Sequence, residues 1–385
     1  MNSWRYYVLP FLSTLLWLTA FVWALPKHGS ELLTWWGGAS RQYLSYLYSH
    51  SQYVKGELGD AIDDTTLYLY AGISYAHGAD PSKINFEHPP LGKYLWGISW
   101  RYFGNPYLLN VLVVAIILGV FFALGRVMQI SDSLIVMAQA LLALILSPSS
   151  LLTTLLDYQL LAVSLVFFLV LFSHFSLKVK AVLAGICLGA LAGIKYPFPN
   201  TLPYILVLIL FFTHQHWRGL LLSLLFAALV YLSSYTMYFV AGHSLVDYLA
   251  FEKYRLSWWL GGREARYYLI WQVFFLGKIK SWWDGGQNWQ ADGFWHWLLP
   301  MSFVTCLSLL GSNIKNLRFH SLLGCVRQPL GLMLIFSFAF LILYTFGSAP
   351  YARYLYVLFP SWILFIGKII TDKLGLKYQD KNSKS

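Results

Sequence analysis

Two adjacent carboxylates are the first residues of this sequence whose types and spacing could carry chemistry. Asp63 and Asp64 open a stretch whose apolar residues recur at helical spacing, which predicts that they lie in the first turn of a helix. A helix cap plus one solvated acid would explain such a pair, because Asp is a favoured capping residue. A carboxylate held at a helix start could also accept a proton from a reacting hydroxyl, so a general base is the competing interpretation.

A second polar group follows in the sequence EHPPLGK at positions 87–93. Its two consecutive prolines favour an extended backbone and end any preceding helix, which would hold the side chains of Glu87 and His88 in a defined place. A bare Pro-Pro pair would indicate only a turn. The six specified residues from His88 to Lys93 are harder to explain by a turn alone.

Three more ionisable residues stand at the ends of long apolar segments, namely Asp157, Lys195 and Arg353. Ionisable groups at membrane depth are costly, so function is their default interpretation, although Lys195 and Arg353 could each merely extend toward the interface. Together the charged residues suit one chemistry. A carboxylate would take the proton of an acceptor hydroxyl that attacks an anomeric carbon, while cations stabilise a departing phosphate oxygen.

The composition of the chain indicates that lipid surrounds the elements that position these residues. Of 385 residues, 58% are hydrophobic and only 11% are charged, which is too apolar a chain for one water-soluble core. The net charge of +11 comes from basic residues scattered between apolar runs, which favours anionic lipid headgroups over nucleic acid as a partner. The three cysteines have neither metal-ligand spacing nor the even number of a disulfide framework.

Ten apolar segments are long enough to cross a bilayer, or nearly so. Two of them are short, so we expect nine to eleven transmembrane helices in an all-α integral membrane protein. The ten segments are approximately 6–25, 107–125, 134–149, 151–173, 181–194, 201–213, 219–240, 296–312, 329–347 and 354–370.

The distribution of Lys and Arg predicts the orientation of these helices. Most basic residues, such as Arg126 and Arg218, fall in connections that would be inside if both chain ends are inside. Two long segments, about 26–105 and 241–295, then lie outside, and their many aromatics favour interfacial helices and ordered loops. We therefore expect one membrane domain over 1–373, followed by a disordered cytoplasmic tail over 374–385.

At these residues the sequence resembles the GT-C membrane glycosyltransferases, specifically the protein O-mannosyltransferase and aminoarabinose transferase superfamily. That family carries an acidic pair in its first outer loop, followed by a His-Pro-Pro-Leu-Gly-Lys segment; the counterparts here are residues 63–64 and 88–93. Weaker similarities follow in the family's order along nearly the whole chain, in the sequences LLDYQLL, LGALAGIKYPF and ARYLYVLFP. The resemblance implies the GT-C fold.

The resemblance also implies roles for the residues of the first outer loop. Asp63 would be the catalytic base, and Asp64 would position the acceptor or the donor. Glu87 and His88 would line the catalytic cavity, where they could contact a divalent metal cation. No other cofactor is implied.

The remaining implied roles concern the donor phosphate. Lys195 and Arg353 would hold it, Asp157 would support the loop, and Tyr196 would line the cavity. The sequence departs from the family pattern at three positions: the second acid is Asp where Glu is usual, Tyr196 stands where Trp is usual, and Asn110 lies where relatives often place an Arg. If that Arg normally contacts phosphate, Lys93 or Arg101 is the expected substitute.

The expected function is transfer of a sugar, mannose by this resemblance, from a polyprenyl-phosphate donor to an acceptor hydroxyl at the extracytoplasmic face of the cell membrane, with inversion. The acceptor could be a protein Ser or Thr, and the alternative is a cell-envelope lipid or glycan. A lipid or sugar transporter or flippase is the rival from another class, although such proteins usually show repeated halves that this sequence lacks. A non-catalytic scaffold that keeps the fold is the third possibility.

Overall fold

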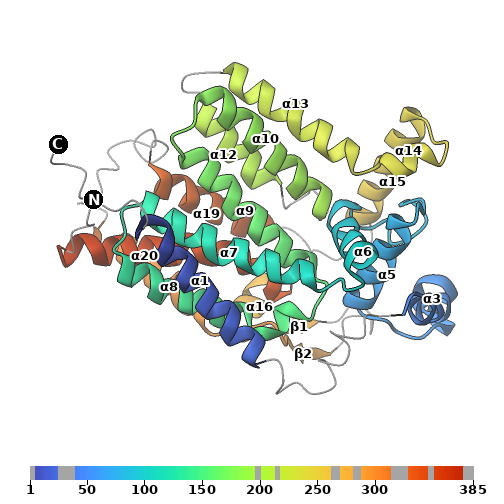
Figure 1. The fold of residues 1–385 in the computed structure, drawn as a ribbon, viewed down its shortest axis with the longest axis horizontal. Coiled ribbons are helices and arrows are strands. Elements are labelled where there is room, and N and C mark those ends of the chain that lie inside the picture. The colour runs from blue at the N-terminus through green and yellow to red at the C-terminus, as the bar shows by residue number, and fades with distance from the viewer. Residues whose placement is uncertain are drawn as a thin grey trace.

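The computed structural model is a bundle of α-helices with a second group of helices at one end (Figure 1). It describes residues 5–24, 40–195, 201–212, 217–261, 269–280, 288–313, 328–345 and 351–375. Three of the helices in these ranges are long and apolar enough to cross a membrane: α7 (Leu108–Val127), α10 (Leu177–Ile194), and the continuous Ala352–Lys373 formed by η4 (Ala352–Leu358) and α20 (Phe359–Lys373).

Seven further apolar helices complete the bundle within the described residues: α1 (Arg5–Ala24), α8 (Asp132–Leu146), α9 (Leu156–Phe172), α12 (Leu202–Phe212), α13 (Trp217–Ser233), α17 (Leu298–Asn313) and α19 (Pro329–Thr345). Each of the ten predicted apolar segments overlaps one of these helices. The prediction of an all-α membrane protein with about ten apolar helices is therefore confirmed.

The two predicted outer segments contain short helices. The first holds α3 (Arg41–His50), α4 (Gln52–Lys55), η2 (Gly56–Leu58), α5 (Asp64–Ala76) and α6 (Leu91–Phe103), and the second holds α15 (Leu245–Gly261) and α16 (Leu269–Leu276), with α14 (Thr236–Val240) just before it. Helices α3, α5, α6, α14 and α15 gather at the right of Figure 1, whereas α20 reaches the left.

The second outer segment also contains a small antiparallel hairpin that the sequence analysis does not predict. Strands β1 (Lys278–Lys280) and β2 (Trp289–Ala291) pair with Lys278 opposite Ala291. Strands of three residues are too short to show an alternating pattern in the sequence. The 3₁₀ segment η3 (Pro148–Leu151) likewise interrupts the chain between α8 and α9.

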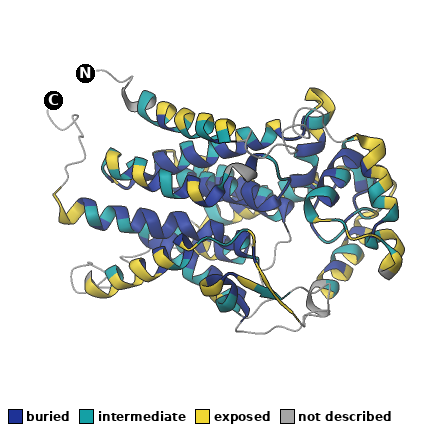
Figure 2. Cartoon of the chain, turned by 90° about the horizontal axis from the view of Figure 1, so that it is seen from below, coloured by how far each residue is buried: buried dark blue, intermediate teal, exposed yellow. Residues whose placement is uncertain are grey.

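Small residues allow close packing between helices of the bundle. A Cβ atom at Gly185 or Gly189 of α10 would overlap backbone atoms of α13, so these glycines let the two backbones approach directly. Helix α7 lies against α1, α8 and α9, and its Phe121 and Phe122 are fully buried. Figure 2 shows that buried residues collect along the middle of the bundle, with exposed residues on its outer helices.

Helices α5 and α6 also cross at a glycine pair, and this crossing brings the two polar motifs of the first outer loop together. A Cβ at Gly97 would overlap the carbonyl oxygen of Gly72, so the two backbones are in contact. Both helices are tied to the start of α9, since Thr154 Oγ1 donates to Thr65 O at 2.7 Å and Gln159 Nε2 donates to Gly92 O at 3.1 Å. The acidic pair and residues 87–93 are thus fixed relative to Asp157.

Some predictions fall outside the described residues. These are the cavity-lining role of Tyr196, the cytoplasmic tail from residue 376 onward, and parts of both outer segments, including residues 26–39. The side of the membrane on which each helix end lies also stays a prediction.

Candidate functional site

The acidic pair lies where the sequence predicts it, at the amino terminus of α5. Asp63 is the N-cap residue and its Oδ1 accepts a hydrogen bond from Thr66 N at 2.8 Å. Asp64 is the first helical residue, and its Oδ2 lies 2.5 Å from Arg353 Nη2. Helix capping therefore uses Asp63, which is exposed, while Asp64 faces the buried cations.

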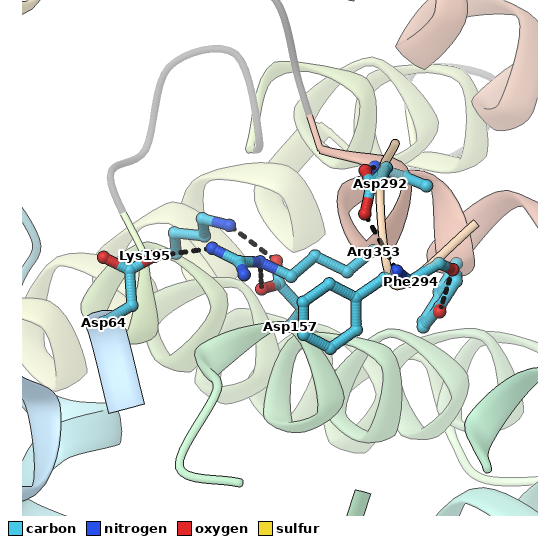
Figure 3. Close-up of polar contacts among 8 residues, drawn as sticks. Asp64, Asp157, Lys195, Asp292, Phe294 and Arg353 are labelled. Carbon is cyan, nitrogen blue, oxygen red and sulfur yellow. Dashed lines mark hydrogen bonds and ion pairs between the residues drawn. The ribbon is translucent and has the colours of Figure 1, made fainter. Parts of the chain in front are cut away.

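Asp157 lies between two buried cations from distant parts of the chain (Figure 3). Its Oδ1 is 2.5 Å from Lys195 Nζ, and its Oδ2 is 3.2 Å from Arg353 Nε. The side chains of all three residues are at most 7% exposed, whereas Asp64 is 32% exposed. The arrangement therefore holds two cations beside an acid that solvent or a ligand can reach.

Each of these charged residues lies at the end of a helix. Asp157 is in the first turn of α9, where a carboxylate is favoured by the helix dipole. Lys195 immediately follows α10 as its C-cap, where a cation is favoured for the same reason. Arg353 is the second residue of η4. Because each residue stands at the end of an apolar helix, the polar cluster forms at one end of the bundle.

Aromatic rings line the cations. Lys195 Nζ is 3.2 Å from the ring centroid of Tyr354, and the Arg353 guanidinium carbon is 4.5 Å from that of Tyr351 and 5.1 Å from that of Phe294. A ring face attracts a cation most strongly where water is excluded. These contacts hold both cations in place without neutralising their charge.

Glu87 and His88 both act on residues next to the acidic pair: Glu87 on Tyr53 and His88 on Tyr68 of α5. The side chain of His88 is buried and its ring meets the ring of Tyr68 edge-on, with centroids 5.8 Å apart. The pKa of Tyr53 is raised above its ordinary value, first by burial and then by the carboxylates of Glu87 and Asp64. Both carboxylates are therefore within electrostatic reach of one phenol, which stays protonated.

Lys93 does not lie among the phosphate-binding candidates, contrary to the expectation. It is fully buried, and its Nζ donates to Asn85 O and Asn85 Oδ1, both at 2.9 Å, and to His88 O at 2.7 Å. An ammonium has three N–H donors, so these bonds use all of them. Lys93 instead fixes the loop on both sides of Glu87.

Asn110 and Arg101 also have structural partners. Asn110 is buried, accepts from Trp96 Nε1 at 3.0 Å, and donates to Leu151 O at 3.2 Å and Thr153 O at 3.0 Å. Arg101 donates to Ala76 O, at the carboxyl end of α5. Lys93 has no N–H donor left for a phosphate in this arrangement, whereas Arg101 is exposed and its possible contact with phosphate stays a prediction. Lys195 and Arg353 are the cations that cluster on Asp157.

The metal site suggested at Glu87 and His88 lacks support from neighbouring ligands. Within the described ranges, no group of three or more His, Cys, Asp or Glu side chains could hold a metal ion. His88 packs against a tyrosine ring as described above, which is a packing contact. We therefore derive no chemical step through a metal.

Sequence reasoning missed Tyr354, Phe294 and Asp292 in this cluster. Tyr354 follows Arg353 in the Arg-Tyr motif, and the adjacency of an aromatic to a buried cation was an available signal. Phe294 and Asp292 come from the aromatic-rich second outer segment and carry no distinguishing pattern. They reach the cluster only through the tertiary fold.

Comparison with known proteins identifies the fold. No family model and no curated protein matches the sequence. Two solved structures do match: ArnT from Cupriavidus metallidurans bound to undecaprenyl phosphate, with a TM-score of 0.57, and the same protein in the apo state, with a TM-score of 0.53. Identity is 14% in both cases, and each alignment covers 92% of this chain. The GT-C fold implied by the sequence resemblance is thereby confirmed.

The chain is shorter than these structures. It spans 61% of the length of the ligand-bound ArnT chain and 60% of the apo chain. The remainder of ArnT has no counterpart in the alignment, so the likeness concerns the fold of about three-fifths of that protein.

Proposed function

We propose that this GT-C protein transfers a sugar from a polyprenyl-phosphate donor to an acceptor hydroxyl, with Lys195 and Arg353 as the phosphate-binding cations. The proposal depends on one observation. Both cations are buried against the carboxylate of Asp157, beside the acidic pair of the first outer loop. The fold adds support, since the ArnT structure with the same fold was solved with undecaprenyl phosphate bound.

The electrostatics of the cluster suit an anionic ligand. Arg353 presents a guanidinium whose planar donors match phosphate oxygens, and one of them already contacts a carboxylate oxygen of Asp64. A phosphate offers the same kind of charged oxygen. Because Asp64 is partly exposed, a phosphate arriving from the solvent or lipid side could take its place on Arg353.

The reaction needs one bond formed, one broken and one proton moved. The acceptor oxygen forms a bond to the anomeric carbon as the bond from that carbon to the phosphate oxygen breaks. The electron pair leaves with the polyprenyl phosphate, whose charge Lys195 and Arg353 stabilise. Asp63 takes the hydroxyl proton, and attack opposite the leaving group inverts the anomeric centre. A phosphate leaving group requires no general acid.

Asp63 is the better placed of the two acids for the role of base. It is exposed, whereas Oδ2 of Asp64 is already occupied by its contact with Arg353. The cap uses only Oδ1 of Asp63, so Oδ2 can face a substrate hydroxyl. Asp64 then governs how Arg353 is presented to the donor.

The sugar and the acceptor complete the proposal. Mannose follows from the family resemblance of EHPPLGK, and a protein Ser or Thr or an envelope lipid or glycan could each supply the hydroxyl. A lipid flippase or transporter would also bind the donor, and it differs by leaving the sugar–phosphate bond intact. The active site would face the extracytoplasmic side, as the distribution of basic residues predicts.

The phosphate site is tested by equilibrium binding of radiolabelled undecaprenyl phosphate to the purified protein in nanodiscs. We expect Arg353→Met to weaken binding by roughly 10- to 100-fold, because a charged hydrogen-bonding partner is lost. Arg353→Lys keeps the charge without the planar donors and should fall between. Arg126→Met is the control, since Arg126 pairs with Asp132 at the far end of α7. Equal binding by the wild type and Arg353→Met would remove the proposed phosphate site.

Donor binding should also depend on pH through Lys195, which lies just beyond the end of α10. Burial lowers the pKa of its ammonium to about 8, against 10.5 for an ordinary lysine. The cation is lost as pH rises through 8, so we expect the affinity for undecaprenyl phosphate to fall between pH 8 and pH 9.5. The phosphate itself has already lost its second proton at these pH values, since that pKa is about 6.

This loss of affinity should be separable from unfolding. A folded-state pKa below the unfolded value means that the unfolded chain binds more protons between pH 8 and 10.5. The contribution of Lys195 to the free energy of unfolding therefore rises with pH in that window. Lys195→Arg should flatten the binding profile because arginine stays charged. A profile that falls equally in Lys195→Arg would assign the effect to another group.

A further inference from the structure

The amino terminus of η4, which carries Arg353, is capped by a side chain from the second outer segment. Tyr351 precedes the helix and provides no side-chain cap. Instead Asp292 Oδ2 accepts a hydrogen bond from Ala352 N at 2.6 Å, although 60 residues separate the two. Asp292 is 7% exposed. A carboxylate here satisfies a backbone N–H that has no partner within the helix and faces the positive end of the helix dipole.

Asp292 is itself held rigidly. Its Oδ1 accepts from Phe294 N at 2.9 Å, and its backbone N donates to Gly277 O at 2.7 Å. The same loop contacts η4 a second time, because Tyr356 OH donates to Phe294 O at 2.5 Å. The turn after the hairpin is thus joined to η4 at two points, at the beginning of the helix and one turn further along.

These two contacts fix the backbone from which Arg353 extends. Arg353 directly follows Ala352, and its guanidinium lies 5.1 Å from the ring centroid of Phe294 (Figure 3). A long side chain reaches two separate carboxylates, Asp64 and Asp157, only if its backbone origin is held. Without the cap, the backbone N–H of Ala352 at the start of η4 would lose the side-chain acceptor that Asp292 provides.

We propose that Asp292 is a positioning residue for the donor phosphate site, which acts by holding Arg353 in place. The inference rests on the proposed function, because it gives Arg353 its role. By this role, a residue of the second outer segment supports the reaction that the first outer segment carries out. Asp292 contacts no substrate in this account and acts solely through η4 and the ring of Phe294.

A double-mutant cycle tests whether Asp292 acts through Arg353. The probe is radiolabelled undecaprenyl phosphate, with the full-length protein in nanodiscs. We expect Asp292→Ala to weaken binding roughly 10-fold in the wild-type background, the order expected when one charge-assisted hydrogen bond is lost. In the Arg353→Met background the same change should weaken binding less than about 2-fold, because the side chain that Asp292 positions is absent.

Two further variants separate positioning from folding. Asp292→Asn keeps one acceptor oxygen and should give an intermediate loss; it replaces Asp292→Ala in the cycle if the latter fails to elute as a monodisperse protein. Asp247→Asn is the matched control, since Asp247 accepts from Ser244 N at the exposed start of α15, and it should bind like the wild type.

The possible outcomes are distinct. An equal loss of affinity in both backgrounds, or no loss from Asp292→Ala, overturns the positioning role while leaving the phosphate site intact. If Arg353→Met itself binds like the wild type, both the phosphate site and the positioning role of Asp292 are disproved. A loss confined to the wild-type background supports the positioning role.

Discussion

Asp63→Asn should lower the rate of sugar transfer by about 10²- to 10⁴-fold, the range usually lost with a general base. The substitution isolates proton transfer unusually well, because Asn caps helices about as well as Asp. The hydrogen bond from Thr66 N to the side chain can therefore persist, and α5 should stay in place. Turnover of a polyprenyl-phosphate sugar by purified protein is the measurement.

Controls on donor binding and folding complete this prediction. Undecaprenyl phosphate should bind Asp63→Asn with wild-type affinity, because Asp63 contacts neither Lys195 nor Arg353 among the described contacts. Asp63→Ala should lose the same activity and also some stability, about 0.5–2 kcal/mol, from the missing cap. Wild-type turnover by Asp63→Asn would rule out Asp63 as the base and transfer that role to another acid, with Asp64 the first to examine.

Asp157→Ala should destabilise the fold more than any other single change to the cluster. It would leave Lys195 and Arg353 buried beside each other with no carboxylate between them. Removing one partner of a buried ion pair typically costs about 3–5 kcal/mol, because the remaining charge is uncompensated. The midpoint of thermal unfolding in detergent should therefore fall clearly below that of the wild type.

A second substitution distinguishes charge repulsion from loss of packing. Asp157→Ala combined with Lys195→Met removes one of the two cations, so part of the lost stability should return. Asp132→Ala serves as the control, because Asp132 is 42% exposed in its pair with Arg126 and should contribute no more than about 1 kcal/mol. A double variant less stable than Asp157→Ala alone would contradict the electrostatic explanation.

The bundle could be predicted from the sequence because the bilayer imposes it. Spanning helices need long apolar runs, and each of the ten runs appears as a helix in the structure. The helix start at Asp64 followed from apolar spacing, with capping by Asp63 as the competing interpretation of that acid. Convergence of Asp157, Lys195 and Arg353 followed from their places at the ends of apolar segments.

Features that depend on distant side-chain partners could not be predicted. Lys93 looked like a cation for phosphate, yet from the first turn of α6 it donates to Asn85 and to the carbonyl of His88 in the preceding loop. Asp292 gave no signal, because its partner Ala352 lies 60 residues away. Strands of three residues and a 3₁₀ start to the last helix are likewise too short to impose a period on the sequence.

The most direct test of sugar transfer measures cleavage of the donor and its movement across the membrane in one experiment. Protein is reconstituted in vesicles with a polyprenyl-phosphate mannose radiolabelled in the sugar, and membrane extracts supply the acceptors. Cleavage of the sugar–phosphate bond and movement of intact donor between leaflets are measured together. We predict that the wild type releases polyprenyl phosphate and labels an acceptor, while Asp63→Asn binds the carrier and does neither. Movement of intact donor by the wild type, with no cleavage of any polyprenyl-phosphate sugar supplied, would contradict the account and indicate a flippase.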